Sequence, residues 1–206
     1  MTIVLTPVIQ RKLKVIAIAL LILAATASFA QQRVFQLDPA QSEVDFTLAD
    51  VLHTVHGKFQ LKSGVLRFDS TTGTASGELV VDATTGNSGN NTRDKKMKRE
   101  ILETDKFPAI VFAPQKIVGT VAPTGGSQVQ LQGTMTLHGQ PHPMALVVPV
   151  QVNGSSASAL VHFEVPYEKW GLKNPSTLFL RVSNKVEIDV HAVGTITSEA
   201  AARTTH

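Results

Sequence analysis

The chain has 206 residues, no cysteine and a formal net charge of +3. Without cysteine it has neither a disulfide framework nor a lipid anchor attached through a cysteine. The charge of +3 equals that of Arg11, Lys12 and Lys14, so the chain from residue 31 onward is neutral before histidines and termini are counted. Composition therefore gives no support to charge-driven binding of nucleic acid or anionic lipid. The length of residues 31–206 is that of one domain with its own core.

Residues 1–30 have the features of a secretory signal peptide. Three basic residues precede an apolar run, Val15 to Ala25, that is short for a membrane span. Ser28 and Ala30 fit the −3 and −1 positions of a cleavage site. A retained membrane anchor is the alternative. We predict cleavage near Ala30, a mature protein in the periplasm or outside the cell, and no stable membrane insertion after cleavage.

Apolar and polar residues alternate along most of the remaining chain. Val44, Phe46 and Leu48 alternate with polar residues, and the pattern recurs over 129–137 and 186–190. Such alternation predicts antiparallel strands with one dry and one wet face. Turn residues such as "KSG" at 62–64 and "HGQPHP" at 138–143 separate the strands, which favours an all-β sandwich or closed barrel. Further strands are predicted at Lys58–Leu61, Val65–Phe68, Gly77–Val81, Ala109–Ile117, Met144–Gln151, Ala159–Val165 and Leu178–Val182.

One segment lacks this alternation and predicts the only helix of residues 31–206. It covers Arg93 to Glu103, with Asn91 or Thr92 as the capping residue and Asp94 in the first turn. Its lysines are predicted to form a solvated face. A nucleic-acid patch is the less favoured alternative, because no aromatic stacking partners accompany these lysines.

The chain shows no motif of a common enzyme class: no G-x-S-x-G, no H-E-x-x-H and no glycine-rich phosphate loop. The histidines are the remaining candidates for chemistry. His53 and His56, three positions apart, would face opposite sides of a strand and so could not chelate one ion by themselves. Two more ligands would be needed, for example His138 and His142. We therefore predict no catalytic residue and no metal site, and keep a histidine-ligated metal enzyme as a minor alternative.

Aromatic composition bears on the kind of barrel. Phenylalanine dominates, whereas Trp170 and Tyr167 are the only residues of their kinds. A transmembrane barrel would carry belts of tryptophan and tyrosine at both interfaces. The dry face is therefore expected inside, where the side chains either fill a small barrel or leave one ligand-sized cavity.

Several segments resemble the YceI-like family, lipocalin-like periplasmic proteins described as polyisoprenoid-binding. The most specific are "DPAQSEVDF" (Asp38 to Phe46), Arg93–Asp94 followed by "FPAIVF", and "GTMTLHG" (Gly133 to Gly139). The resemblance covers nearly all of Val34 to Ile196. It implies an eight-stranded antiparallel lipocalin-like barrel with one short helix at its side. It also implies a long apolar tunnel for an amphipathic isoprenoid or fatty chain.

The dry strand faces then supply the expected lining of this tunnel. Met97, Ile101, Phe107 and Trp170 are candidates for its mouth or for the helix contact, and His53 is predicted to point inward at the barrel end. Arg93 and Asp94 are expected to anchor the helix, with contact to the polar end of a ligand as the alternative. The predicted lining is Phe46, Leu48, Phe59, Phe68, Leu79, Val81, Phe112, Leu131, Met135, Leu146, Val148, Phe163, Leu180 and Ile188.

The sequence thus predicts a signal peptide over 1–30, a lipid-binding barrel over 31–196 and a disordered tail over 197–206. The expected partner is an amphipathic lipid rather than nucleic acid, and no cofactor other than a bound lipid is expected. A barrel seam or the Trp170 loop would suit a homodimer, although nothing requires one. The alternative function is a packed interaction module of the same fold, without a ligand.

Overall fold

The computed structural model describes residues 32–49, 54–176 and 181–198. The predicted signal peptide, His53, Leu180 and the tail beyond Ser198 lie outside these residues. The described strands are β1 (Gln32–Leu37), β2 (Glu43–Ala49), β3 (Thr54–Asp69), β4 (Thr74–Asn87), β5 (Ala109–Val118), β6 (Gly125–Leu137), β7 (Gln140–Asn153), β8 (Ser156–Val165) and β9 (Val186–Ser198). The last strand therefore extends two residues past the boundary predicted for the domain.

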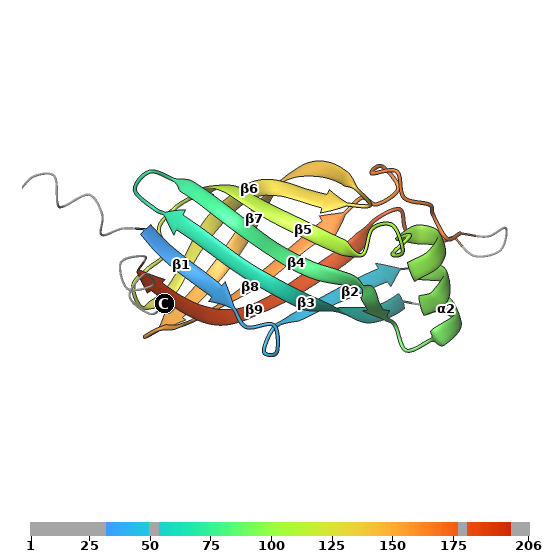
Figure 1. Cartoon of the computed structure of the whole chain (residues 1–206), viewed down its shortest axis with the longest axis horizontal. Helices are drawn as coiled ribbons and strands as arrows, with labels where there is room; N and C mark the ends of the chain where they lie inside the picture. Colours follow the sequence, from blue (N-terminus) through green and yellow to red (C-terminus); the bar gives the residue numbers. More distant parts are fainter. Residues whose placement is uncertain (1–31, 50–53, 177–180, 199–206) are drawn as a thin grey trace, which may run out of the picture.

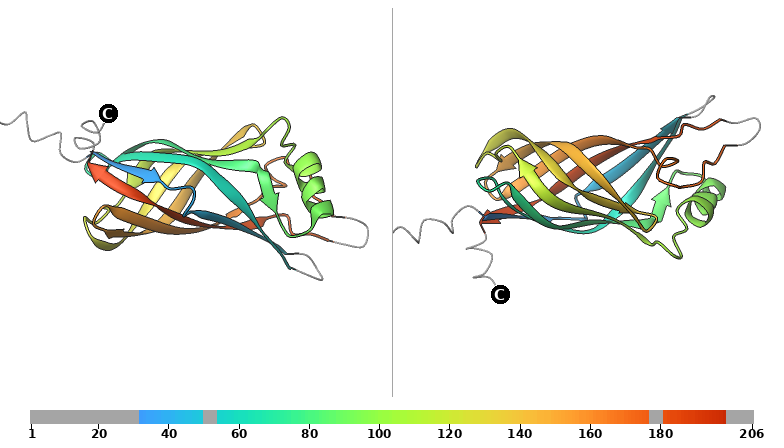
Figure 2. Two further views of the ribbon diagram at one scale, coloured as in Figure 1. Left: turned by 60° about the horizontal axis from the view of Figure 1, so that its bottom comes forward. Right: turned by 90° about the horizontal axis from the view of Figure 1, so that it is seen from above.

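Strands β2 to β9 form a closed antiparallel barrel. Each strand pairs with its neighbour in the sequence, and β2 pairs with β9 to close the ring. The predicted all-β, eight-stranded antiparallel fold is confirmed. The barrel is elongated, and the helix lies at one of its ends (Figures 1 and 2).

Strand β1 adds a ninth strand that the alternation did not predict. It pairs with the same two strands as β2, namely β3 and β9, but nearer the opposite end of the barrel. The two short strands thus occupy one position in the wall, joined by an outward loop at 38–42. The Ser42 hydroxyl accepts the Val193 N–H at 3.0 Å and donates to the Asp38 carbonyl at 2.7 Å. Through these bonds, Asp38 and Ser42 of the "DPAQS" segment hold the loop between β1 and β2 against β9.

Strand β3 corrects one sequence prediction. The "KSG" stretch at 62–64 is not a turn, and the two predicted strands on either side of it form one strand of sixteen residues. A register shift between Leu61 and Ser63 absorbs the irregularity. Gly64 is needed for close packing, because a Cβ there would lie 2.5 Å from Leu79 Cδ2. Composition alone does not distinguish this bulge from a turn.

Two further predictions need correction. Of the predicted strand Leu178–Val182, the described part contains no strand beyond a single bridge at Val182. The turn expected over 138–143 is reduced to His138 and Gly139, whose φ angles of 52° and 71° fit a two-residue type I′ hairpin. Gln140 onward already belongs to β7.

The helical segment follows β4 and lies two residues nearer the N-terminus than predicted. It consists of α2 (Asn91–Lys96) and a π-helical turn η2 (Met97–Ile101). The capping residue is Asn90, not Asn91 or Thr92, and its side-chain oxygen accepts the N–H groups of Thr92 and Arg93 at 3.1 Å. The helix therefore starts two residues earlier than the charge pattern indicates.

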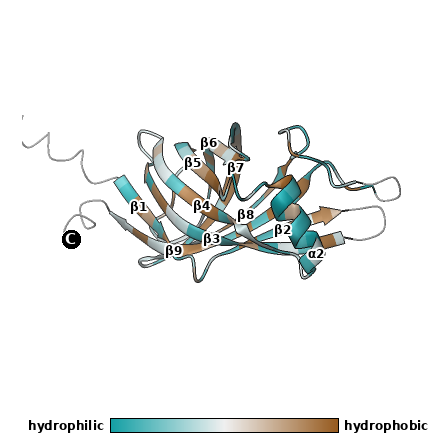
Figure 3. Cartoon of the chain, turned by 45° about the vertical axis from the view of Figure 1, so that its right-hand side comes forward, coloured by the Kyte–Doolittle hydropathy of each residue, from teal (hydrophilic) through white to brown (hydrophobic). Residues whose placement is uncertain are grey.

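The core lies inside the barrel. Colouring by hydropathy shows apolar and polar residues alternating along the strands (Figure 3). On β6, Val129, Leu131, Met135 and Leu137 are all buried, as the alternation predicts. One closed wall thus encloses an apolar interior.

Candidate ligand-binding cavity

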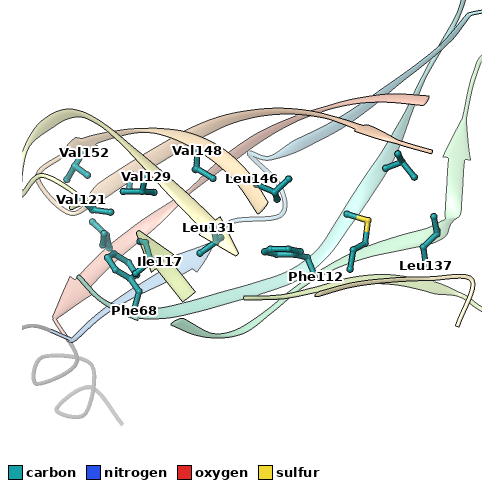
Figure 4. Close-up of a cluster of buried hydrophobic side chains, with 14 of the residues drawn as sticks. Phe68, Phe112, Ile117, Val121, Val129, Leu131, Leu137, Leu146, Val148 and Val152 are labelled. Carbon is teal, nitrogen blue, oxygen red and sulfur yellow. The ribbon is translucent and has the colours of Figure 1, made fainter. Parts of the chain in front are cut away.

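The barrel interior holds a cavity of about 680 Å³. Apolar side chains from all eight barrel strands line it, together with residues of the helical segment. Figure 4 shows how buried apolar side chains follow one another along the barrel, from Phe68 and Val121 at one end to Phe112 and Leu137 toward the other. The volume is within the usual range for small-molecule sites and far above the voids of a packed core.

Most of the predicted lining residues do line this cavity. They include Met97 and Ile101, two of the candidates for the mouth or the helix contact. His53 and Leu180 lie outside the described residues, so their placement stays a prediction. The residues placed on the cavity are Phe46, Leu48, Phe59, Phe68, Leu79, Val81, Met97, Ile101, Phe112, Leu131, Met135, Leu146, Val148, Phe163 and Ile188.

Phe107 and Trp170 do not belong to the cavity lining. The Phe107 ring packs on His138 with a centroid distance of 4.5 Å, and a Cβ at Gly139 would lie 2.6 Å from it. Phe107 therefore supports the β6–β7 turn. Trp170 stacks on the His142 ring at 4.0 Å with an interplanar angle of 3°. Both contacts join segments that are distant in the sequence, so alternation within one strand could not predict them.

Sequence reasoning missed several lining residues. Three of them alternate in step with predicted lining residues of the same strand: Val55 and Leu61 with Phe59 on β3, and Val161 with Phe163 on β8. The alternation could have found them. Tyr167 also lines the cavity, and its hydroxyl donates to the Ser183 carbonyl. Burial raises the pKa of Tyr167 to about 12, so the phenol stays neutral and its oxygen adds no charge to the cavity wall.

The polar lining is concentrated at the helix end. Five polar lining residues are close in sequence and come from the turn before α2 and from α2 itself: Ser88, Asn90, Thr92, Arg93 and Lys96. Apart from these residues, the lining is apolar except for Ser158 and the Tyr167 phenol. The cavity is therefore amphipathic along its length, with its polar groups and both of its cations at one end.

Arg93 and Asp94 make anchoring contacts with Ser88. The Asp94 carboxylate is buried and accepts the Ser88 N–H and hydroxyl, while Arg93 donates from Nε to the Ser88 hydroxyl and from a terminal nitrogen to the Ser88 carbonyl. Asp94 thus serves the joint between β4 and the helix. Arg93 serves this joint and also lines the cavity.

The described histidines do not assemble into a metal site. His56 faces outward and lies 3.1 Å from the Thr47 hydroxyl, whereas His138 Nε2 lies 2.7 Å from Glu103 Oε2. Hydrogen bonds from Lys106 and His138 lower the pKa of Glu103. Within residues 32–49, 54–176 and 181–198, no three His, Asp or Glu side chains are grouped closely enough to hold a metal ion.

No helix in the described part of the chain is long and apolar enough to cross a membrane.

Solved structures share this fold at low sequence identity. Burkholderia cenocepacia BcnA aligns with a TM-score of 0.64 and 16% identity over 77% of this chain and 99% of its own. A polyisoprenoid binding domain from Saccharophagus degradans, implicated in plant cell wall breakdown, gives 0.59 and 17% over 79% and 98%. The Campylobacter jejuni YCEI protein gives 0.53 and 16% over 70% and 86%. At such identities the likeness establishes the fold.

A search of curated proteins finds no sequence that matches this chain. A family model does match: the YceI-like domain aligns with residues 35–194, which is most of the chain and includes all eight barrel strands in whole or in large part. The residues that resemble this family, from Asp38 to Phe46 and from Gly133 to Gly139, fall within the match. The chain belongs to the YceI-like family.

Proposed function

We propose that this protein is a non-catalytic binding protein that holds one amphipathic lipid, with an isoprenoid or fatty chain, inside the barrel. The observation that carries the proposal is the cavity of about 680 Å³, which is apolar along the barrel and polar at the helix end. Burying hydrocarbon yields about 0.8 kcal/mol per methylene, so a chain in this cavity binds without many polar contacts.

The same cavity argues against a packed interaction module. Protein interiors leave few voids larger than a water molecule, because an unfilled void forfeits contacts on every side. Residues 1–30 support export, and we extend the proposal to a periplasmic or extracellular protein. The Saccharophagus degradans neighbour is described as polyisoprenoid-binding, which supports the isoprenoid choice without fixing it.

The first test is extraction of the full chain, purified from the envelope of its own cells, followed by mass spectrometry of the extract. We expect about one amphipathic lipid per protein. The second test titrates the delipidated protein with a fluorescent polyene fatty acid, displaced by geranylgeraniol. A protein that is empty on purification and takes up neither probe would overturn the proposal.

A matched pair of variants assigns the binding to the cavity. Met135 lines the cavity, and its neighbour Thr134 has the opposite parity on β6. Met135→Trp should fill part of the cavity and weaken binding of the fatty acid at least tenfold, whereas Thr134→Trp should leave it within twofold. Circular dichroism of both variants checks that the barrel is retained. Equal effects of the two substitutions would place the binding elsewhere.

A further inference from the structure

Barrel strands β7 and β8 are joined along only part of their length. Strand β7 pairs with β6 from Val152 down to Gln140, and β8 pairs with β9 over all its residues. Between β7 and β8, however, pairing covers only Val150–Asn153 with Ser156–Ala159. Residues 140–149 of β7 and 160–165 of β8 form no cross-strand pair with each other. The wall therefore has a seam, which begins where this short ladder ends and runs toward the helix end.

Proline explains where the ladder stops. Asn153 and Ser156 flank a two-residue turn and form a hydrogen-bonded pair, so the alternate residues Gln151 and then Pro149 direct their backbone groups toward β8. Pro149 has no N–H to offer to Leu160, the next residue in register. The ladder thus ends at the first position that cannot donate.

The same parity recurs along the seam. Pro141 and Pro143 also occupy positions whose backbone nitrogen would face β8, so none of the three prolines interrupts the ladder with β6. Since the seam lacks these donors, separating its two edges there breaks no ladder hydrogen bonds. Opening it costs less than opening any fully paired pair of strands.

The seam is apolar inside the wall and, along its β7 edge, outside it as well. Outward residues of β7 from Pro141 to Pro149 are all apolar and exposed, whereas outward residues of β6 are mainly glutamine and threonine. Val147 on β7 and Leu160 on β8 are 51% and 64% exposed. Directly behind them, Leu146 and Val148 of β7 and Val161 and Phe163 of β8 line the cavity. On the β7 edge an exposed apolar strip therefore backs directly onto the cavity lining, whereas the outward residues of β8 beyond Leu160 are the polar His162 and Glu164.

Both ends of the seam are fastened. The short ladder and its hairpin hold one end, and the stack of Trp170 on His142 holds the other, since Trp170 follows β8 and His142 belongs to β7. A seam fastened at both ends could part in its middle and admit a flexible chain sideways while the other strand pairs of the barrel stay intact.

From the prolines, the missing ladder and the apolar strip, we propose that the β7–β8 seam is the lateral entry through which the hydrocarbon chain of the ligand passes into the cavity. The occupant is the chain itself, because an exposed apolar strip that continues into an apolar cavity suits a hydrocarbon. Lateral entry through the seam rests on the proposed function. With such an entry, the chain does not have to enter end-on past the polar residues at the helix end.

The test is a crosslink across the seam. Because the chain has no cysteine, the two introduced cysteines are the only thiols that can react. Continuing the register places Val147 opposite His162, and both side chains face outward. We would join V147C and H162C with a cleavable bis-maleimide. The control joins V147C to Q130C, its partner in the complete β6–β7 ladder. Stopped-flow uptake and release of the polyene fatty acid gives both rates and the Kd.

We expect the seam crosslink to slow uptake and release at least tenfold while the Kd changes less than threefold, and cleavage of the linker to restore both rates. The control crosslink should leave the rates within twofold. Unchanged rates in the seam-locked protein, or equal slowing in the control, overturn the lateral entry alone. If the protein binds no fatty acid even before crosslinking, the proposed function fails and the entry with it.

Discussion

The Asp94 carboxylate accepts both the backbone N–H and the hydroxyl of Ser88, at 3.0 and 2.5 Å. Ser88 follows the last residue of β4, and Asp94 lies in the middle of α2. Asp94 is 7% exposed, so this joint is made away from solvent. It fixes the segment that carries the polar residues of the cavity relative to the barrel rim.

Replacing Asp94 with alanine should destabilise the protein by about 1 to 3 kcal/mol, because the Ser88 donors lose their partner in a buried place. Urea unfolding monitored by circular dichroism measures the change. Asp105→Ala is the matched control, because Asp105 is exposed in the neighbouring loop. Similar losses of stability in both variants would contradict the role assigned to the Ser88 joint.

Lys96 should discriminate between anionic and neutral head groups. Its side chain lines the polar end of the cavity, whereas that of the adjacent Lys95 does not. Lys96→Gln should weaken binding of a fatty carboxylate about two- to fivefold at low salt, the range for an exposed ion pair. Binding of the corresponding fatty alcohol should not change, and Lys95→Gln should affect neither. Titrations of both ligands check this, and parallel losses for acid and alcohol would exclude a charge effect.

Ala157 should limit the length of chain that the cavity accepts. It is 3% exposed, lines the cavity, and pairs with Val152 at the end remote from the helix. Ala157→Leu should lower affinity for long prenols at least fivefold while short ones bind as before, with a stability loss of about 1 to 3 kcal/mol from overpacking. Val118→Leu, on the exposed outer face of β5, is the control. A uniform loss for all chain lengths would argue that Ala157 does not limit length.

The stack on Trp170 should make stability depend on pH through His142. Burial lowers the pKa of His142 below its ordinary 6.5, so the fold favours the neutral ring. The stability that depends on the neutral His142 ring is complete above pH 6.5, and it is lost as the pH falls through the lowered pKa. His142→Phe keeps a ring on Trp170 without titrating, so its stability should decline less between pH 7 and 5.

His162 acts in the opposite direction. The hydrogen bond to Asp189 raises the pKa of His162. The resulting stabilisation is complete below the ordinary pKa of histidine, and it is lost as the pH rises through the raised pKa. The comparison is therefore made in a His162→Asn background, by denaturant unfolding from pH 5 to 8. Parallel curves for the His142→Phe variant and its parent would contradict the assignment.

The sequence predicts the barrel well where one strand face alone decides burial. Phe46, Leu131 and Met135 follow strict alternation and lie where it places them. The family resemblance adds closure and strand number, which alternation cannot supply. The helix also follows from local signals, although its start depends on the Asn90 cap rather than on the charges that follow.

The errors arise where contacts are distant or where backbone geometry decides. Gly64 follows directly after a bulge and packs on Leu79, and a glycine beside a lysine and a serine is equally typical of a turn. Trp170 and Phe107 pack on histidines of other segments, so no local pattern reveals their partners. The seam depends on which edge of β7 its prolines face, which only the strand register determines.

The shared position of β1 and β2 between β3 and β9 also bears on how the protein folds. Arg33 pairs with Ser198 and Thr47 with Glu187, so the barrel wall cannot close until nearly the whole chain is present. Pairings this distant in sequence slow folding, because loop closure must precede the contacts that reward it. An open sheet with unpaired β2 and β8 edges would persist meanwhile and be prone to aggregate. Closure by the final strand is thus the step at which ligand or chaperone would most affect the yield of native protein.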